Sequence, residues 1–540
     1  MKPLTLKYFA VWMIVSIHLQ VTAADRYDVV VYGGTSGGVT AAVQCSRMGK
    51  TVVLIESTQF LGGLTTGGLG ATDIGNKRAI GGLSREFYQR IYKYYLATET
   101  WTRETREAYF KDRVKNEESM WTFEPSVATK IFNDMITEAK VPVVFGQRLD
   151  LKNGVIKDGA RITKIVMENG RSFEASVFID ATYEGDLMAK AGVSYHVGRE
   201  SNQTYAETIN GLQMKGTIHH QFVKQVDPYI KPGIPTSGLL PGVTAMPVGK
   251  DGDGDHRIQA YNFRLCTTDK AENRRPWPKP EGYNELRYEL LLRNFEAGDK
   301  RVPWHPLWMP NRKSDTNNNF AFSTDNIGMN YEYPDGDYAV REKIWKEHEQ
   351  YTKGLMWTLA NHPRVPESVR QEFNRIALVK DEFVDNDNWP RQLYVREARR
   401  MVSEYVMSEK NCKRIEIVAD SVGMGAYNMD SHNTQRYVTE EGFARNEGDI
   451  QIGTKPYPIS FRSIRPKAEQ CTNLVVPVCL AASHISYGSI RMEPVFMVMG
   501  QSAATAAVHA INEQTNVQRI DPDKLQKQLL KDGQMLDFEF

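Results

Sequence analysis

The sequence has almost no net charge and no long apolar run beyond its first residues. Lys and Arg number 67 against 66 Asp and Glu, which gives a formal net charge of +1. A dedicated nucleic-acid-binding protein needs a surplus of basic side chains to displace counterions from phosphates, so this class is disfavoured. After residue 24 no segment approaches the ~18 consecutive apolar residues of a membrane helix, and we expect no stable membrane span. With 41% hydrophobic and 25% charged residues, the chain is predicted to be a large globular protein, most consistent with an enzyme.

Cysteine is scarce, and its spacing excludes the usual clusters. The chain has five cysteines, an odd number, and no CxxC pair. We therefore expect buried free thiols in the core, with neither a disulfide framework nor an iron–sulfur cluster. The acidic run at residues 251–255 lacks EF-hand spacing, so no metal site is expected. The sequence also has no phosphate-binding P-loop, catalytic-triad elbow, zinc motif or internal repeat.

The first two dozen residues have the composition of a targeting segment. Lys2 and Lys7 precede an apolar run at residues 8–17, and small residues follow at 21–24. This pattern predicts a secretory signal peptide over residues 1–24, and hence a periplasmic or secreted protein. The alternatives are an uncleaved amphipathic anchor or a misassigned start.

A strand–turn–helix–strand unit follows directly. Residues 27–32 read as a strand, 36–48 as a helix of small residues, and 51–55 as a second strand that ends at Glu56. This is the βαβ unit of a dinucleotide-binding α/β fold, in which a helix N-terminus binds the pyrophosphate and an acid accepts hydrogen bonds from the ribose. The predicted contacts of the turn are Gly33, Gly34, Thr35, Ser36, Gly37 and Gly38. Thr35 stands where a glycine is usual, and its hydroxyl could bond phosphate.

Three later blocks predict FAD rather than NAD. A glycine-rich stretch suggests backbone laid against a flat ligand, with contacts at Gly62, Gly63, Leu64, Thr65 and Thr66. A hairpin with an Asn-Gly turn at 169–170 leads to a buried strand at 177–182, which is followed by a further set of predicted contacts: Ala181, Thr182, Gly185 and Asp186. A helix over residues 493–511 opens with Glu493-Pro494 and contains Gly500. Its positive end would stabilise negative charge on a reduced flavin.

The sequence resembles the FAD-dependent oxidoreductase family, in the branch of flavoproteins with a heterodisulfide reductase-like FAD core. The resemblance rests on DVVVYGGTSGGVTAA, LGGLTTGGLG, FIDATYEGDL, IQAYNFRLC, PNRKSDTNN and SHISYGSIRMEP, spread from Asp28 to Ala507. It implies bound FAD and an α/β Rossmann-like domain of the glutathione-reductase type. Relatives with iron–sulfur clusters hold them through cysteine clusters, which this chain lacks.

The middle of the chain is predicted to be a large inserted α+β substrate or cap domain, because its composition changes to tryptophan, proline and charged residues. The predicted organisation is residues 25–200 and 455–515 for the FAD-binding domain, 201–454 for the insert and 516–540 for a C-terminal tail. Within the insert we expect a strand at 258–265 with one face exposed to a cavity, and a polar loop at 311–319. Residues 391–404 read as a helix with a salt-bridged face; the alternative is that Arg396 points to the active site.

These features predict an exported enzyme that transfers a hydride from a small organic substrate to FAD, with an unknown electron acceptor. In a predicted loop at 483–491, His484 is the candidate base. Arg491 and Arg264 are candidates for orienting the substrate, and Tyr261 for donating a hydrogen bond. Tryptophans in the insert make a carbohydrate one candidate substrate. The alternatives are an FAD-containing redox-neutral polysaccharide lyase and a non-catalytic glycan-binding protein.

Overall fold

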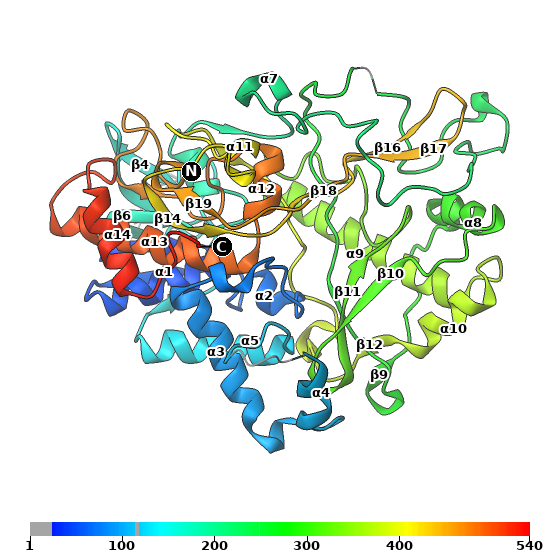
Figure 1. Ribbon diagram of the computed structural model, residues 1–540, viewed down its shortest axis with the longest axis horizontal. Coiled ribbons are helices and arrows are strands. Elements are labelled where there is room, and N and C mark those ends of the chain that lie inside the picture. The colour runs from blue at the N-terminus through cyan, green and yellow to red at the C-terminus, as the bar shows by residue number, and fades with distance from the viewer. Residues whose placement is uncertain (1–23, 114–117, 248, 540) are drawn as a thin grey trace, which may run out of the picture.

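The structure is a computed structural model that describes residues 24–113, 118–247 and 249–539. Except for Ala24, the predicted signal peptide lies outside the described residues. Two regions lie side by side in Figure 1. One contains a largely parallel sheet with the first and last long helices, and the other contains an antiparallel sheet built from the middle of the chain.

The first region is organised by a seven-stranded sheet in the order β3-β2-β1-β6-β5-β4, with β20 also paired to β6. Its strands are β1 (Asp25–Tyr32), β2 (Val52–Ile55), β3 (Val143–Val144), β4 (Val155–Asp158), β5 (Arg161–Val166), β6 (Ser172–Asp180) and β20 (Leu474–Val475). The pairs β1–β2, β2–β3, β1–β6 and β20–β6 are parallel, and the β4–β5–β6 hairpin is antiparallel. The predicted Rossmann-like α/β fold is therefore confirmed. The sheet also joins residues from both ends of the chain.

Two helices pack closely beside this sheet, α1 (Ser36–Arg47) and α13 (Glu493–Asn512). At their contact a Cβ on Gly500 would lie 2.0 Å from the carbonyl oxygen of Gly37, so only glycine fits there. Gly500, predicted as a cofactor contact, thus serves helix packing. By length and composition α13 could cross a membrane, but 89% of its most apolar window is buried within the protein, as expected of a core helix.

The second region contains a five-stranded antiparallel sheet in the order β10-β11-β8-β12-β9. Its strands are β8 (Leu265–Thr268), β9 (Arg274–Arg275), β10 (Trp304–Trp308), β11 (Lys313–Asn318) and β12 (Ala377–Val379). Three helices accompany it, α8 (Glu289–Glu296), α9 (Tyr338–Asn361) and α10 (Glu367–Arg375), as Figure 1 shows. The whole sheet falls within the predicted insert.

Several local predictions in this region are wrong. The predicted polar loop at 311–319 contains the buried strand β11, whose Lys313 ammonium lies 2.7 Å from the Glu382 carboxylate. The predicted strand at 258–265 is irregular before β8 and buried along its whole length, although Arg264 lines a cavity as expected of one face. The predicted helix at 391–404 is extended and ends in β13 (Arg400–Met401). In each case, polar side chains that suggested exposure to solvent instead form contacts with residues that are distant in the sequence.

The C-terminal third differs from expectation at two places. The predicted loop at 483–491 holds a buried helix, α12 (His484–Ile490), whose N-cap Ser483 accepts a hydrogen bond from Ser486 N. The predicted tail contains α14 (Pro522–Lys531), which buries Leu525 and Leu529. Strands β14 (Ser421–Gly425) and β19 (Tyr457–Ser460) pair across the predicted boundary at 454. That boundary stays a prediction.

The cysteines follow the sequence prediction. All five are free and buried: Cys45, Cys266, Cys412, Cys471 and Cys479. Burial raises the pKa of each thiol, so they behave as small apolar core residues.

Candidate active site

The turn between β1 and α1 is held by steric constraints and by one hydroxyl. Gly33 has φ +103°, and a Cβ on Gly38 would lie 1.9 Å from the Gly33 carbonyl oxygen. Thr35 is the N-cap of α1: its hydroxyl accepts from Gly38 N at 3.2 Å and donates to Ala181 O at 2.7 Å. The proton of this hydroxyl thus holds the turn against Ala181, and the phosphate contact of Thr35 stays a prediction. The first-turn amides of α1 lack intrahelical acceptors, as in any helix.

The N-terminus of α1 opens into a cavity of about 220 Å³, here called the α1 cavity. Among its lining residues are six of the predicted cofactor contacts: Gly33, Thr35, Glu56, Gly63, Thr182 and Asp186. The Glu56 carboxylate follows β2 and accepts from Gly34 N at 2.6 Å and from Thr58 N at 2.7 Å. A carboxylate has about four lone-pair sites, so Glu56 retains capacity for a ribose hydroxyl.

Glu493, the first residue of α13, joins four segments of the fold. One carboxylate oxygen accepts from Ser36 Oγ at 2.6 Å and Thr65 Oγ1 at 2.8 Å, and the other accepts from the Tyr183 hydroxyl at 2.8 Å. Burial raises the pKa of Glu493 against the lowering effect of these hydroxyls. The predicted contacts Ser36, Thr65 and Glu493, far apart in sequence, therefore meet at one point between α1 and α13.

The rest of the glycine-rich stretch is held within the protein. Leu64 N donates to the Tyr183 hydroxyl at 2.9 Å, and Thr66 Oγ1 donates to Leu61 O. A Cβ on Gly62 would lie 2.4 Å from Thr66 Cγ2. These contacts fix helix α2 (Leu64–Gly67) beside Glu493.

Asp186 connects the first region to the second. Its carboxylate lies 2.6 Å from Arg341 of α9 and 2.7 Å from Arg399. Burial alone would raise the pKa of Asp186, but the two guanidiniums outweigh it and hold the pKa below its usual range. Gly185 precedes it in the left-handed conformation, at φ +68°, as the N-cap of α6 (Asp186–Lys190). Asp186 lines the α1 cavity, but arginines occupy both of its oxygens.

These residues fit the adenosine diphosphate part of a dinucleotide. The fit rests on a cradle that side chains would block, namely Gly33 and Gly38, on a helix N-terminus, and on a carboxylate at the end of β2. Side chains of α9 also line the α1 cavity, Tyr338, Arg341 and Trp345. The second region thus contributes to the same cavity.

A second cavity, of about 310 Å³ and here called the polar cavity, lies beyond the glycine-rich stretch. Its lining residues are Asp73, His220, Arg264, His305, Asn317, Asn318, Asn319, Tyr394, Arg396, Tyr427, Asp430, His432 and Gln451. All but Asp73 come from the predicted insert. A Cβ on Gly68 would lie 2.5 Å from the Arg264 carbonyl oxygen, so the stretch that begins at the α1 cavity ends against the wall of the polar cavity.

Of the four predicted catalytic residues, Arg264 belongs to this wall, and Arg491 lies behind it in contact with two wall residues. Arg264 lines the polar cavity and makes two 2.8 Å hydrogen bonds to Asp315 of β11. Arg491, at the end of α12, donates to the Tyr394 hydroxyl at 2.7 Å and to the Asp430 carboxylate at 3.0 Å, and both partners line the polar cavity. The prediction that these two arginines lie near one site agrees with this geometry.

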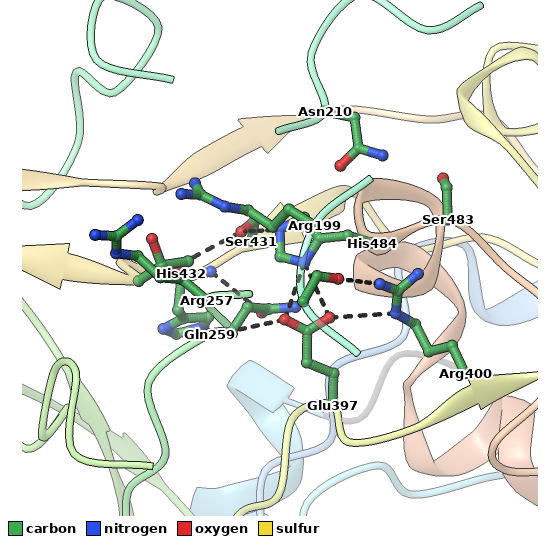
Figure 2. Close-up of polar contacts among 12 residues, drawn as sticks. Arg199, Asn210, Arg257, Gln259, Glu397, Arg400, Ser431, His432, Ser483 and His484 are labelled. Atoms are coloured by element: carbon green, nitrogen blue, oxygen red, sulfur yellow. Dashed lines mark hydrogen bonds and ion pairs between the residues drawn. The ribbon is translucent and has the colours of Figure 1, made fainter. Parts of the chain in front are cut away.

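The other two lie in buried contacts. His484 is 2% exposed. Its Nδ1 lies 2.9 Å from the Glu397 carboxylate and its Nε2 lies 2.9 Å from Ser431 Oγ, as Figure 2 shows. The Tyr261 hydroxyl donates to the Glu397 carbonyl. Neither residue is among those that line the two cavities described above, and this placement does not favour His484 as a free base or Tyr261 as a donor to substrate.

Sequence reasoning missed His432, which does line the polar cavity. Its Nδ1 lies 2.7 Å from Asp325 Oδ2, and its Nε2 lies 3.4 Å from Asp430 Oδ2. Burial and Arg396 would lower the pKa of His432, but the two carboxylates outweigh them and raise it. Asp430 and His432 are separated by one residue in the sequence, a spacing that places both side chains on one face of an extended chain. That spacing was the available signal.

Comparison with known proteins agrees with the nucleotide-binding class that the fold and the α1 cavity define. A sequence model described as FAD dependent oxidoreductase matches residues 28–529. The chain therefore belongs to the FAD-dependent oxidoreductase family, a family of flavin enzymes. The narrower relation to heterodisulfide reductase stays a prediction. No curated protein sequence matches the chain at a significant level.

Solved structures similar to part of this chain include a flavin-containing monooxygenase, a dehydrogenase and a deaminase. A flavin-containing monooxygenase from Stenotrophomonas maltophilia is 17% identical over 33% of this chain and 43% of its own, with a TM-score of 0.20. L-proline dehydrogenase from P. horikoshii is 17% identical over 33% and 59%, with a TM-score of 0.23. L-amino acid deaminase from Proteus vulgaris is 15% identical over 34% and 55%, with a TM-score of 0.24. The chain thus spans about half the length of these proteins.

Proposed function

We propose that this protein oxidises a small organic substrate bound in the polar cavity, with FAD held at the α1 cavity and along the glycine-rich stretch. FAD bound there would supply the acceptor for the hydride that leaves the substrate carbon. The observation that carries the proposal is one chain segment shared by the two sites: residues 63–68 run from the wall of the α1 cavity to the wall of the polar cavity. A cofactor along this stretch would face substrate at the polar cavity.

The chain's own residues supply binding and orientation in this proposal. The α1 amides and Glu56 hold the nucleotide end of the cofactor, and Glu493 fixes α13 against α1 and α2. Arg264 and Arg491 position the substrate. Their conformations are set by carboxylates and by Tyr394, so little ordering is needed when substrate binds. His484 becomes a positioning residue, because Glu397 and Ser431 engage both of its ring nitrogens.

Substrate identity and export are the finer parts of the proposal. The leader composition supports export, and an electron acceptor outside the chain would complete the reaction. Tryptophans of the insert supported a carbohydrate, but Trp277, Trp304 and Trp389 are buried in the core. The two aromatic residues of the polar cavity are Tyr394 and Tyr427. Polar recognition is therefore favoured over stacking on a sugar ring.

Visible spectroscopy of the purified, FAD-supplemented protein tests the proposal. We expect flavin absorbance that survives gel filtration and is bleached anaerobically by a member of a panel of sugars, hydroxy acids and amino acids. The variant Gly453→Ala should keep this flavin absorbance, because a Cβ at that position would meet only Asn428, at 3.8 Å. Turnover of a polysaccharide without bleaching would favour the redox-neutral lyase, and a correctly folded protein that retains no flavin would overturn the proposal.

A further inference from the structure

The strongest unassigned feature is a buried arginine at the wall of the polar cavity. Arg396 is 1% exposed, and its Nη1 donates to the Ala260 carbonyl. Its Nη2 lies 3.0 Å from Asp325 Oδ1, too poorly aligned for a hydrogen bond. In the part of the chain that the structure describes, Arg396 Nε and Nη2 have no hydrogen-bond acceptor. A buried guanidinium usually has all its donors satisfied. These two nitrogens are therefore the donors that a ligand would satisfy.

The charge of Arg396 is also incompletely compensated. Asp325 is shared, because its other carboxylate oxygen lies 2.7 Å from His432 Nδ1. Burial lowers the pKa of Arg396 even though Asp325 opposes this effect. By contrast, Arg264 makes two 2.8 Å hydrogen bonds to Asp315, whose other hydrogen bond comes from the uncharged Ala71 N–H. Removing a charge from water is expensive unless it is paired, and an anion in the polar cavity would supply the missing partner.

Other groups in the polar cavity suit the rest of such a ligand. Asn318 Oδ1 and His220 Nδ1 are buried, line the cavity and have no partner among the described residues. They provide an acceptor and a ring nitrogen for a polyhydroxylated molecule. Tyr394 lies between two guanidiniums, with its ring centroid 4.7 Å from Arg396 and 5.5 Å from Arg491. It holds both arginines at one side of the cavity.

We infer that the polar cavity binds a hydroxylated carboxylate, with Arg396 holding the carboxylate and His432 accepting the proton of the hydroxyl that is oxidised. In the neutral tautomer whose Nδ1–H is donated to Asp325, the Nε2 of His432, 3.4 Å from Asp430 Oδ2, is the nitrogen that accepts the proton. The O–H bond breaks toward this nitrogen as the substrate carbon loses its hydride and the C=O bond forms. This inference rests on the proposed function, and it names the substrate class of the same site.

Glucuronate and glucose are a suitable pair of probes, because they share a skeleton and differ in one carboxylate. Calorimetry on the FAD-loaded protein should show binding of glucuronate at least ten-fold tighter than that of glucose. In Arg396→Gln we expect glucuronate to bind roughly ten- to a hundred-fold more weakly, the effect of losing hydrogen bonds to a charged group. Flavin content should be unchanged. Arg396→Lys should retain part of the binding, because it keeps the charge but loses the planar fork.

Arg436→Gln is the matched control. Arg436 is also buried, but it lines a different cavity. Its replacement should leave the preference for glucuronate intact. Equal affinity of the wild type for glucuronate and glucose, or equal glucuronate binding by the two glutamine variants, would overturn the inference. The inference would also be overturned if none of glucuronate, lactate and acetate bound to the protein. Should Arg396→Gln not fold, Arg396→Lys decides.

The proton-accepting role has a separate test. In His432→Asn we expect glucuronate affinity to be kept while anaerobic flavin reduction slows by roughly 10²- to 10⁴-fold. In the wild type this rate should rise with pH as His432 loses its proton, under the influence of the groups that face it: Asp325, Asp430, Arg396, His220 and Asp449. The rise should be absent in His432→Asn, and an unchanged profile there would remove this role. Binding of glucuronate without flavin reduction by any substrate would instead contradict the proposed function.

Discussion

The α1 cavity and the polar cavity are built from sequence in different ways. Much of the α1 cavity comes from one continuous unit, in which β1, the glycine turn, α1, β2 and Glu56 follow one another in the sequence. The polar cavity takes its lining from residues spread between Asp73 and Gln451. A site made by one local unit carries its constraint in a motif. A site assembled from distant segments is instead specified by pairs of charged residues that lie far apart in the sequence.

The largest expected effect comes from breaking the link between the two regions. Asp186→Ala removes the buried carboxylate that Arg341 and Arg399 share. Arg399 keeps its ion pair with the exposed Asp335. We expect the free energy of unfolding to fall by about 4 kcal/mol, as for other broken buried ion pairs. Urea unfolding measures this change. Because the pKa of Asp186 is held low, the stabilisation should be present at neutral pH and lost as pH falls through the folded-state pKa.

The exposed pair Glu342–Lys346 is the control for this prediction. Both side chains are more than half exposed, and their carboxylate and ammonium lie 2.6 Å apart. Glu342→Gln should therefore leave the unfolding midpoint unchanged. If Asp186→Ala were as harmless, the two regions would not depend on this link.

The next effect concerns the motif itself. In Gly38→Ala the new Cβ would lie 1.9 Å from the Gly33 carbonyl oxygen, so α1 must move away from β1. We expect a loss of about 3 kcal/mol in the free energy of unfolding, in the range of overpacked sites. FAD should no longer be retained on gel filtration. Gly453→Ala is the control, and flavin retention by Gly38→Ala would show that the turn tolerates a side chain.

The same contrast explains which elements the sequence could predict. The βαβ unit, the hairpin of β5 and β6, and α13 were predicted correctly, because periodicity, an Asn-Gly turn and a proline at the helix start are local signals. Helix α12 was missed. Its sequence, HISYGSI, contains weak helix formers, and its complete burial stabilises it instead.

Long-range ion pairs account for the errors in the middle of the chain. The Arg396–Arg400 stretch looked like a salt-bridged helix, but its partners Asp325, Asp186 and Glu200 lie on other segments. Likewise, the polar residues of β11 suggested a loop because Arg264, the partner of Asp315, was not evident from spacing. One sequence does not state which distant charges pair. Arg264 and Arg491 were found as candidates because they lie in the sequence motifs quoted above. His432 lies outside those motifs and its partner Asp325 is distant in the sequence, so it was missed.

A smaller effect is expected in the pH dependence of the unfolding free energy, through a buried carboxyl group in the sheet beside the α1 cavity. Burial raises the pKa of Asp180, at the end of β6, from 3.8 to about 6 against hydrogen bonds from Thr182 and Met188. A folded-state pKa above the unfolded one means that the contribution is fully present below pH 3.8 and lost as pH rises through 6. The expected loss is roughly 2–3 kcal/mol. Urea unfolding across this window measures it.

Asp180→Asn cannot titrate and gives the reference for that measurement. The difference in unfolding free energy between wild type and variant should change across the window. Outside the window it should be flat. The exposed Asp134, paired with Lys130, is the control, and Asp134→Asn should reproduce the wild-type profile. Equal profiles for all three proteins would mean that Asp180 is ionised without penalty in the fold.

The smallest effect separates His484 from His432. Ser431→Ala removes the hydrogen bond at His484 Nε2 but leaves Glu397 on Nδ1, and we expect a loss of about 1 kcal/mol in stability. A positioning residue should change the rate of flavin reduction only modestly and leave its pH profile intact. If His484 were the base, freeing Nε2 would shift that profile. His484→Gln extends the comparison, because its amide can still form a hydrogen bond to Glu397. If this variant keeps the wild-type pH dependence while His432→Asn loses it, the proton-accepting role belongs to His432 in the polar cavity. The reverse result would assign that role to His484.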